Sequence, residues 1–157
     1  TEGGLDLGGK VSLLAGHSLG EYAALAAGRS FAIPDAARLL RTRGLAMQKA
    51  VPAGEGGMAA IIGGTLAHVQ EICAEAGKSS TLEIANDNGG GQIVISGKMD
   101  AIYKAIALAK ATKIKRALKL PVSAPFHSSL MRPADEVMSE ALAITDIAAP
   151  TIPFIAN

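Results

Sequence analysis

With 157 residues, of which 49% are hydrophobic and only 3% aromatic, the chain can form a globular domain whose core is built mainly from aliphatic side chains. Fifteen basic and fourteen acidic residues leave a net charge of +1, which excludes a general electrostatic attraction for nucleic acid or an anionic membrane. The longest apolar runs are far shorter than the about 20 residues of a membrane-spanning helix, and a single cysteine, Cys73, excludes an internal disulfide and favours the cytoplasm.

The first elements along the chain are a strand, a sharp turn and two helices. A Gly-rich stretch, residues 1–9, shows no signal segment and is typical of a loop, so we expect an internal part of a longer protein. The apolar run 11–15 predicts a strand, and the segment 20–27 is rich in helix-forming residues. Pro34 suits the first turn of a second helix that ends near Val51.

The middle of the chain alternates short apolar runs with helical stretches. The expected order is strand, helix, strand, strand, helix, strand, over residues 58–62, 66–76, 82–86, 92–96, 100–111 and 114–120. This is the order of a ferredoxin-like unit, with Gly89, Gly90 and Gly91 in the turn between its two middle strands. We therefore expect an inserted ferredoxin-like subdomain over residues 57–120.

The last part of the chain returns to the pattern of the first. A loop over residues 121–127 leads to a predicted helix over 128–144 and a predicted strand over 152–156. The expected fold class is therefore α/β, in which residues 1–56 and 121–157 form a parallel layer around the inserted subdomain.

The pentapeptide Gly16-His17-Ser18-Leu19-Gly20 matches the pattern G-x-S-x-G and lies between a predicted strand and a predicted helix. The glycines permit a strained turn that exposes the Ser18 hydroxyl, while the following helix directs backbone N–H groups towards the same space. Such a pentapeptide also arises by chance in a Gly-rich chain. Its position favours Ser18 as a nucleophile, with the Leu19 N–H as an oxyanion donor.

A serine hydroxyl needs a base to accept its proton, and the chain offers three histidines. His68 falls on the polar side of its predicted helix, and His17 is held beside the nucleophile in the turn. His127 lies on a loop at the edge of the α/β layer and is left by elimination as the candidate base. A loop histidine is also commonly an ordinary surface residue, and no acidic third member is evident.

Arg43 lies on the apolar stripe of its predicted helix, together with Ala36, Leu40 and Met47. A charge that faces inward needs a partner, which would be an internal carboxylate or an anionic ligand, unless the side chain extends to solvent.

A second group of cations lies within ten residues near the end of the predicted subdomain. Its members are Lys110, Lys113, Lys115, Arg116 and Lys119. Such a cluster is usually a solvated face, but it could also contact an acidic partner or a nucleotide phosphate.

Taken together, these features resemble the malonyl-CoA:acyl-carrier-protein transacylases of fatty-acid synthesis, which are related to polyketide synthase acyltransferase domains. The likeness covers nearly the whole chain. It lies in residues 16–22 (GHSLGEY), the Arg43-Gly44 pair before Met47, residues 57–58 (GM), 86–88 (NDN), 92–97 (QIVISG) and 120–127 (LPVSAPFH).

The resemblance implies an α/β-hydrolase-like subdomain with the ferredoxin-like insertion. It implies that Ser18 is acylated, that His127 is its base, and that Arg43 binds the free carboxylate of malonyl. The family orients its histidine with a main-chain carbonyl of a later segment, in place of an acidic residue. Unlike the family, this chain has no glutamine-bearing Gly-rich loop before Val11, ends before the segment expected to carry that carbonyl, and has Gly90 where proline is common.

The expected activity is that of an [acyl-carrier-protein] S-malonyltransferase. Ping-pong transfer would move malonyl from the substrate malonyl-CoA to the phosphopantetheine thiol of acyl carrier protein, without a metal or redox cofactor. Phe126 would narrow the acyl site, and Lys115 with Arg116 would contact the carrier or CoA. The alternatives are a polyketide-type acyltransferase domain, a fragment that binds the carrier without turnover, and a serine esterase, against which Arg43 argues.

Overall fold

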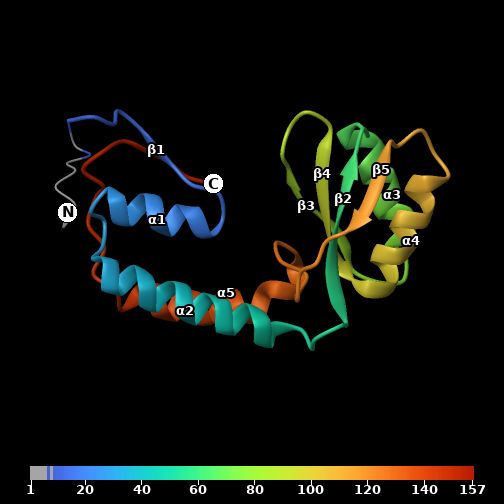
Figure 1. Cartoon of the computed structure of the whole chain (residues 1–157). Helices are drawn as coiled ribbons and strands as arrows, with labels where there is room; N and C mark the ends of the chain where they lie inside the picture. The colour runs from blue at the N-terminus through green and yellow to red at the C-terminus, as the bar shows by residue number, and fades with distance from the viewer. Residues whose placement is uncertain (1–6, 8) are drawn as a thin grey trace. The chain divides into compact units, whose positions relative to one another are not determined.

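The computed structural model describes residue 7 and residues 9–157 (Figure 1). Contacts divide the chain into two compact units, which we call the serine unit (Thr1–Gly44 and Val137–Asn157) and the sheet unit (Leu45–Glu136). The structure is mixed α/β and contains a two-stranded parallel sheet and a four-stranded antiparallel sheet. No helix within the described ranges is both long enough and apolar enough to cross a membrane.

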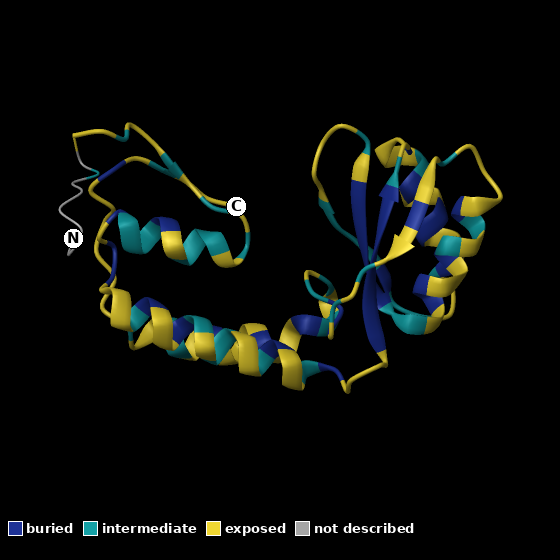
Figure 2. Cartoon of the chain, in the orientation of Figure 1, coloured by how far each residue is buried: buried dark blue, intermediate teal, exposed yellow. Residues whose placement is uncertain are grey.

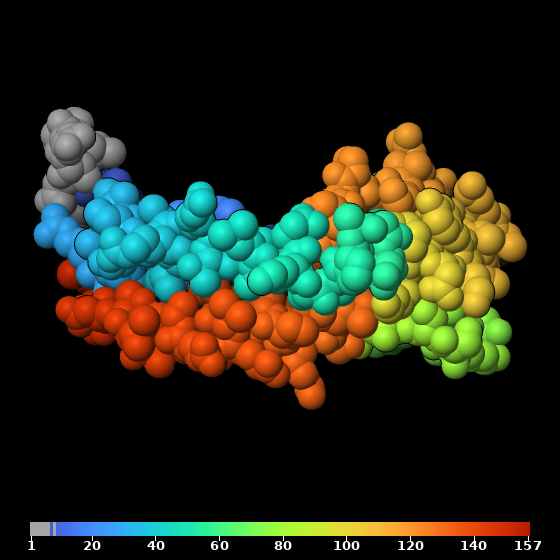
Figure 3. All heavy atoms as spheres, turned by 90° about the horizontal axis from the view of Figure 1, so that it is seen from below, coloured from blue at the N-terminus to red at the C-terminus, as the bar shows by residue number. Residues whose placement is uncertain are grey.

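The serine unit is built from the two ends of the chain, and in the space-filling view its cyan atoms lie beside its red ones (Figure 3). Strand β1 (Leu14–Ala15) pairs in parallel with β6 (Phe154–Ile155), and helix α1 (Leu19–Ala27) follows β1 directly. Helix α2 (Ile33–Ala50) contributes Leu39 to a small core. The other buried members of this core are Phe31, Ala36 and Met138.

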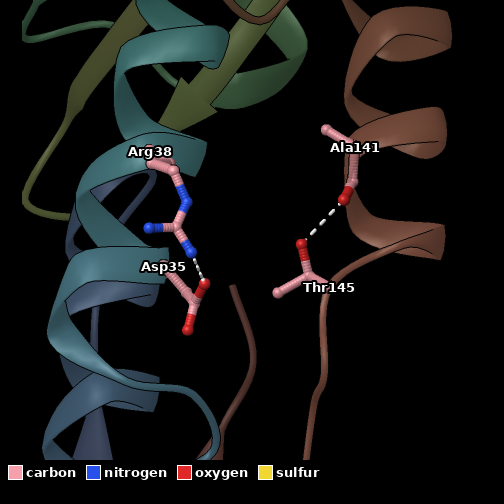
Figure 4. Close-up of polar contacts among 4 residues, drawn as sticks. All are labelled: Asp35, Arg38, Ala141 and Thr145. Carbon is pink, nitrogen blue, oxygen red and sulfur yellow. Dashed lines mark hydrogen bonds and ion pairs between the residues drawn. The ribbon is translucent and has the colours of Figure 1, made fainter.

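Local polar contacts stabilise the helix ends in the serine unit (Figure 4). Asp35 forms an ion pair with Arg38 in the first turn of α2, where a carboxylate is favoured beside the positive end of the helix dipole. The Thr145 hydroxyl donates a hydrogen bond of 2.7 Å to the carbonyl oxygen of Ala141. This contact satisfies one of the carbonyls that have no partner within a helix end.

The sheet unit has the element order predicted for residues 57–120. Its elements are β2 (Gly56–Ile62), α3 (Leu66–Ala76), β3 (Leu82–Asp87), β4 (Gln92–Lys98), α4 (Met99–Lys110) and β5 (Arg116–Lys119). The strands pair antiparallel in the order β3-β4-β2-β5, and α3 and α4 cover one face (Figure 1). The largest core lies between the sheet and the helices and includes Ile61, Ile95 and Ile102. In Figure 2 the buried residues of this unit are dark blue.

The opposite face of this sheet carries the loop that follows β5. Glu83, Ser96 and Met58 lie opposite one another on β3, β4 and β2, so their side chains share this face. Pro125 lies so close to Gly56 that a Cβ atom there would stand 2.5 Å from the proline Cγ. The loop is therefore packed directly against β2.

Several predicted elements differ from the structure in extent. The helix predicted over 128–144 consists of a short 3₁₀ helix, η1 (Ser129–Met131), followed by α5 (Arg132–Ala143). Pro133 has no N–H to donate to the Ser129 carbonyl, and its place in the first turn of α5 is where a proline is tolerated. Strands β1 and β6 are shorter than predicted, because an apolar run does not specify how far its partner extends.

Candidate active site

Ser18 lies at the sharp turn between β1 and α1, where the sequence predicted it. Its backbone has φ 54° and ψ −111°, a conformation that a residue with a side chain adopts only under strain. Gly16 is required at this turn, because a Cβ atom there would lie 2.1 Å from the carbonyl oxygen of Gly20. The Ser18 hydroxyl does not cap α1, and Leu19, as the first residue of α1, places its N–H at the positive end of the helix.

Asn157 contacts this turn from the other end of the chain. The Ser18 N–H donates to Asn157 Oδ1 at 2.7 Å, and the Asn157 N–H donates to Glu21 Oε1 at 3.4 Å. The pairing of β6 with β1 brings Asn157 to the serine. No local pattern in the sequence signals this contact, because the two residues are 139 positions apart.

Arg43 reaches Ser18 from α2. Its Nη2 donates to Ser18 Oγ at 2.8 Å, and its guanidinium carbon lies 6.0 Å from the centroid of the Tyr22 ring. The sequence predicted that this half-buried arginine needs a partner, and in the structure its side chain contacts the Ser18 hydroxyl and the Tyr22 ring. Within the described residues, 7 and 9–157, Arg43 forms no ion pair with a carboxylate.

Tyr22 lies between the arginine and the small core of the serine unit. Its ring centroid is 6.5 Å from that of Phe31. Burial raises the pKa of the Tyr22 hydroxyl, an effect that the nearby Arg43 cation partly opposes. Tyr22 therefore stays neutral near neutral pH and presents an aromatic face to the guanidinium, which a cation–π contact favours.

His127 and Phe126 belong to the sheet unit. His127 is exposed and has φ 57°, in the left-handed region. Phe126 is half-buried against the cluster that contains Met47, Val51 and Met131. The structure thus brings Arg43 to Ser18 within one unit and places the candidate base in the other, so the pairing of Ser18 with His127 stays a prediction.

The remaining candidates lie outside the serine turn. Lys115 precedes the edge strand β5 and Arg116 begins it, and both are exposed. The N–H of His68 donates to the hydroxyl of Thr65 at 3.3 Å and so helps to cap α3. Within the described part of the chain, no group of three or more histidine, cysteine or acidic side chains could hold a metal ion.

A cavity of about 1260 Å³ lies in the serine unit and is lined mainly by apolar residues of α1, α2 and the segment 146–152. Neither Ser18 nor Arg43 lines it. The serine turn, and not this cavity, is therefore the place where the Ser18 hydroxyl, the Arg43 cation and the N-terminus of α1 meet.

Comparisons with known proteins agree with one another. Residues 7–157 match the family described as the acyl transferase domain. The malonyl CoA-acyl carrier protein transacylase of Salmonella typhimurium is 46% identical over 151 residues, which are 96% of this chain and 49% of that protein. The one of Bacillus subtilis is 46% identical over 144 residues, or 91% of this chain and 45% of that protein.

Solved structures show the same likeness. The crystal structure of acyl-carrier-protein-S-malonyltransferase from Bartonella henselae matches with a TM-score of 0.93 and 53% identity, and covers 99% of this chain and 50% of that chain. The structure of a type II PKS acyl-carrier protein in complex with its malonyl-transacylase matches with a TM-score of 0.89 and 40% identity. This match covers 92% of this chain and 47% of that chain. The chain thus spans about half the length of the relatives that it matches.

Proposed function

We propose, from the finding that this chain belongs to the acyl transferase domain family, that the protein acts as an [acyl-carrier-protein] S-malonyltransferase in fatty-acid biosynthesis. It would move malonyl from CoA to the phosphopantetheine thiol of acyl carrier protein. The names of the relatives support this substrate pair. The observation that carries the proposal is the 2.8 Å contact between the Arg43 guanidinium and the Ser18 hydroxyl in a strained turn.

The proposed mechanism has two half-reactions at Ser18. In the first, Ser18 Oγ attacks the thioester carbonyl carbon while His127 accepts the hydroxyl proton, and the Leu19 N–H stabilises the oxyanion. The C–S bond then breaks, and CoA leaves as a thiol with the proton from His127. In the second, the carrier thiol loses its proton to His127 and attacks the acyl-serine, and Ser18 regains its proton.

Arg43 gives this site a preference for an acyl group with a second charge. The planar guanidinium can bind the malonyl carboxylate through two parallel hydrogen bonds, and the half-buried setting strengthens the interaction. The Tyr22 ring beneath the guanidinium limits its orientations. Phe126 is proposed to narrow the acyl site where a branched group would need space.

Three further features belong to the same proposal. Residues 1–56 and 121–157 form the α/β-hydrolase-like catalytic subdomain, and residues 57–120 form the ferredoxin-like one, which the strand order β3-β4-β2-β5 supports. Lys115 and Arg116 contact the acidic carrier protein or the CoA phosphates. The reaction takes place in the cytoplasm and needs no metal or redox cofactor.

A polyketide carrier is a second candidate acceptor. It is favoured by the likeness to the malonyl-transacylase in complex with a type II PKS acyl-carrier protein. Both candidates share the acyl-serine step, so transfer to carrier proteins of the two kinds would separate them.

The deciding experiment is intact-mass analysis of the protein after mixing with malonyl-CoA. We expect one malonyl adduct, located on Ser18, which disappears in Ser18→Ala and persists in Ser12→Ala, an exposed serine of the same unit. His127→Ala should slow formation of the adduct by about 10²–10⁴. An adduct at normal stoichiometry in Ser18→Ala would exclude this nucleophile, and an adduct that no carrier protein removes would exclude transfer.

A further inference from the structure

The loop that carries His127 is held to the sheet at a point that the mechanism above does not use. The carboxylate of Glu83, on β3, accepts two hydrogen bonds from Ser129, two residues after His127. The Ser129 N–H donates to Oε2 and the Ser129 hydroxyl donates to Oε1, both at 2.7 Å. One carboxylate thus binds a single residue through both of its oxygens.

The position of Ser129 explains why an external acceptor is needed. Ser129 is the first residue of η1, which leads into α5, and the first N–H groups of a helix have no acceptor within the helix. The preceding residue normally caps such an end, but the Ser128 hydroxyl instead donates to the Pro125 carbonyl at 2.7 Å. Glu83 therefore provides the cap from 46 residues away, with a charge that suits a helix N-terminus.

His127 lies between two points at which the loop is attached to the sheet. Before it, Pro125 is buried against Gly56 of β2. After it, Ser129 is bound to Glu83 of β3. The backbone of His127 has φ 57°, which costs free energy and persists only where the surroundings impose it. Without the second attachment, the loop could relax this conformation and move the imidazole.

We propose that Glu83 is a positioning residue, which holds the His127 loop against the sheet through Ser129 so that the imidazole is oriented for proton transfer. The inference rests on the proposed function only in giving His127 the role of base. The attachment of the loop is a property of the sheet unit alone and can be measured without any substrate.

Three variants of the intact protein test the proposal, with a matched control. Glu83→Ala removes both acceptors. Glu83→Gln removes the charge but keeps both bonds within reach, because the amide oxygen can accept from the Ser129 N–H and the amide nitrogen can donate to the hydroxyl. Ser129→Ala removes one bond of the two. Glu71→Ala is the control, because Glu71 is an exposed glutamate on α3, within the same unit.

The first measurement is hydrogen exchange of the Ser129 amide without substrate. We expect exchange at least about tenfold faster in Glu83→Ala than in the parent protein, because the N–H loses its acceptor and opens to solvent. Glu83→Gln and Glu71→Ala should exchange like the parent. Unchanged exchange in a folded Glu83→Ala protein would overturn the attachment, whatever reaction the protein catalyses.

The second measurement is single-turnover formation of the malonyl adduct. In Glu83→Ala the maximal acylation rate should fall about 10- to 100-fold, the range expected for a displaced catalytic group. The malonyl-CoA concentration that gives half of the maximal rate should stay within about twofold. Ser129→Ala should show a smaller loss, which keeps the test available if Glu83→Ala does not fold. Glu83→Gln should recover most of the rate, because it restores the bonds.

Two results would remove Glu83 from the proposed role. An acylation rate in folded Glu83→Ala equal to that of Glu71→Ala would show that the attachment does not position the base. A Glu83→Gln protein as slow as Glu83→Ala would show that the negative charge acts, and not the hydrogen bonds. If the parent protein forms no malonyl adduct, the proposed function fails, and the exchange measurement still decides whether Glu83 holds the loop.

Discussion

At the scale of single residues, the site combines the half-buried Ser18 hydroxyl with a cation that has no carboxylate partner among the described residues. The Arg43 guanidinium donates to Ser18 Oγ and lies over Tyr22. A fixed cation in a half-buried site interacts more strongly with an anion than it would in water. It also carries a desolvation cost that a bound carboxylate would offset.

Replacement of Arg43 should therefore change selectivity more than overall reactivity. We expect Arg43→Ala to lose about 2–5 kcal/mol of transition-state stabilisation for malonyl transfer, because one partner of a charge pair is removed. Transfer of acetyl, which has no second carboxylate, should fall much less. The measurement is kcat/KM for malonyl-CoA and acetyl-CoA.

Two matched variants accompany this comparison. Arg43→Lys keeps the charge but cannot form two parallel hydrogen bonds, so it should recover only part of the malonyl preference. Arg41→Ala removes an exposed cation of the same helix and should leave kcat/KM unchanged for both substrates. Equal losses for malonyl and acetyl in Arg43→Ala would mean that the arginine is structural.

How much of the site the sequence predicts depends on how local each contact is. The strained turn at Ser18 and the inward direction of Arg43 follow from a short motif and a helical stripe. The contacts of Ser18 with Asn157 and of Ser129 with Glu83 join residues 139 and 46 positions apart. They depend on strand pairing and on the path of a loop, which no local pattern specifies.

At the scale of elements, the order and type of helices and strands were predictable because each has a clear apolar period or run. Their lengths were not. Strand β1 contains two residues where five were predicted from 11–15, because its partner β6 pairs with only those two. The start of α5 depends on Pro133, which has no N–H to donate to the Ser129 carbonyl. The α-helix therefore begins at Arg132, after η1.

The turn between β1 and α1 makes unequal demands on the two glycines of the motif. A Cβ atom on Gly16 would lie 2.1 Å from the Gly20 carbonyl oxygen, whereas one on Gly20 would meet no described atom within 4 Å beyond its chain neighbours and the backbone of its own helix. Gly16→Ala should therefore lower the free energy of unfolding by about 1–3 kcal/mol or more, as expected for overpacking. Gly20→Ala should cost less than Gly16→Ala in the same denaturant titration, and the reverse order would contradict the described turn.

Helix α3 contributes the free thiol of Cys73 to the core of the sheet unit. Burial raises the pKa of this thiol to about 11, whereas an unfolded chain has a cysteine pKa of about 8.5. The native state thus retains a proton that the unfolded state releases. The contribution of Cys73 to the free energy of unfolding is therefore fully present below about pH 8.5 and is lost as the pH rises towards about 11.

Cys73→Ala tests this pH dependence. The free energy of unfolding of the parent protein should fall more steeply than that of the variant between about pH 8.5 and about pH 11, because only the parent has the thiol. Iodoacetamide should modify Cys73 slowly in the native state and quickly in denaturant. Parallel stability curves, or rapid modification of the folded protein, would show that the thiol is not buried as described.

At the scale of the whole molecule, a net charge of +1 gives no long-range attraction for an acidic partner. Any attraction must come from a local excess of one sign. The group of Lys110, Lys113, Lys115, Arg116 and Lys119 forms such an excess, because these side chains are exposed and form no ion pair within the described residues. Charged residues on an edge strand also discourage pairing with another sheet, which is a sufficient reason for Arg116 and Lys119 without any partner.

Charge reversal distinguishes these two roles. If the cluster attracts the carrier protein or CoA, Lys115→Glu with Arg116→Glu should raise the KM for at least one of them, because a local attraction becomes a repulsion. The control is Lys78→Glu with Lys104→Glu, which changes the net charge by the same amount at two lysines whose ammonium groups face Glu75 and Asp100. The KM difference between the two pairs of substitutions should shrink as the ionic strength rises above about 0.1 M, because exposed charges more than about 10 Å apart are then largely screened from each other. If both pairs give the same KM for both substrates at low salt, the cluster protects the sheet edge and does not recruit a partner.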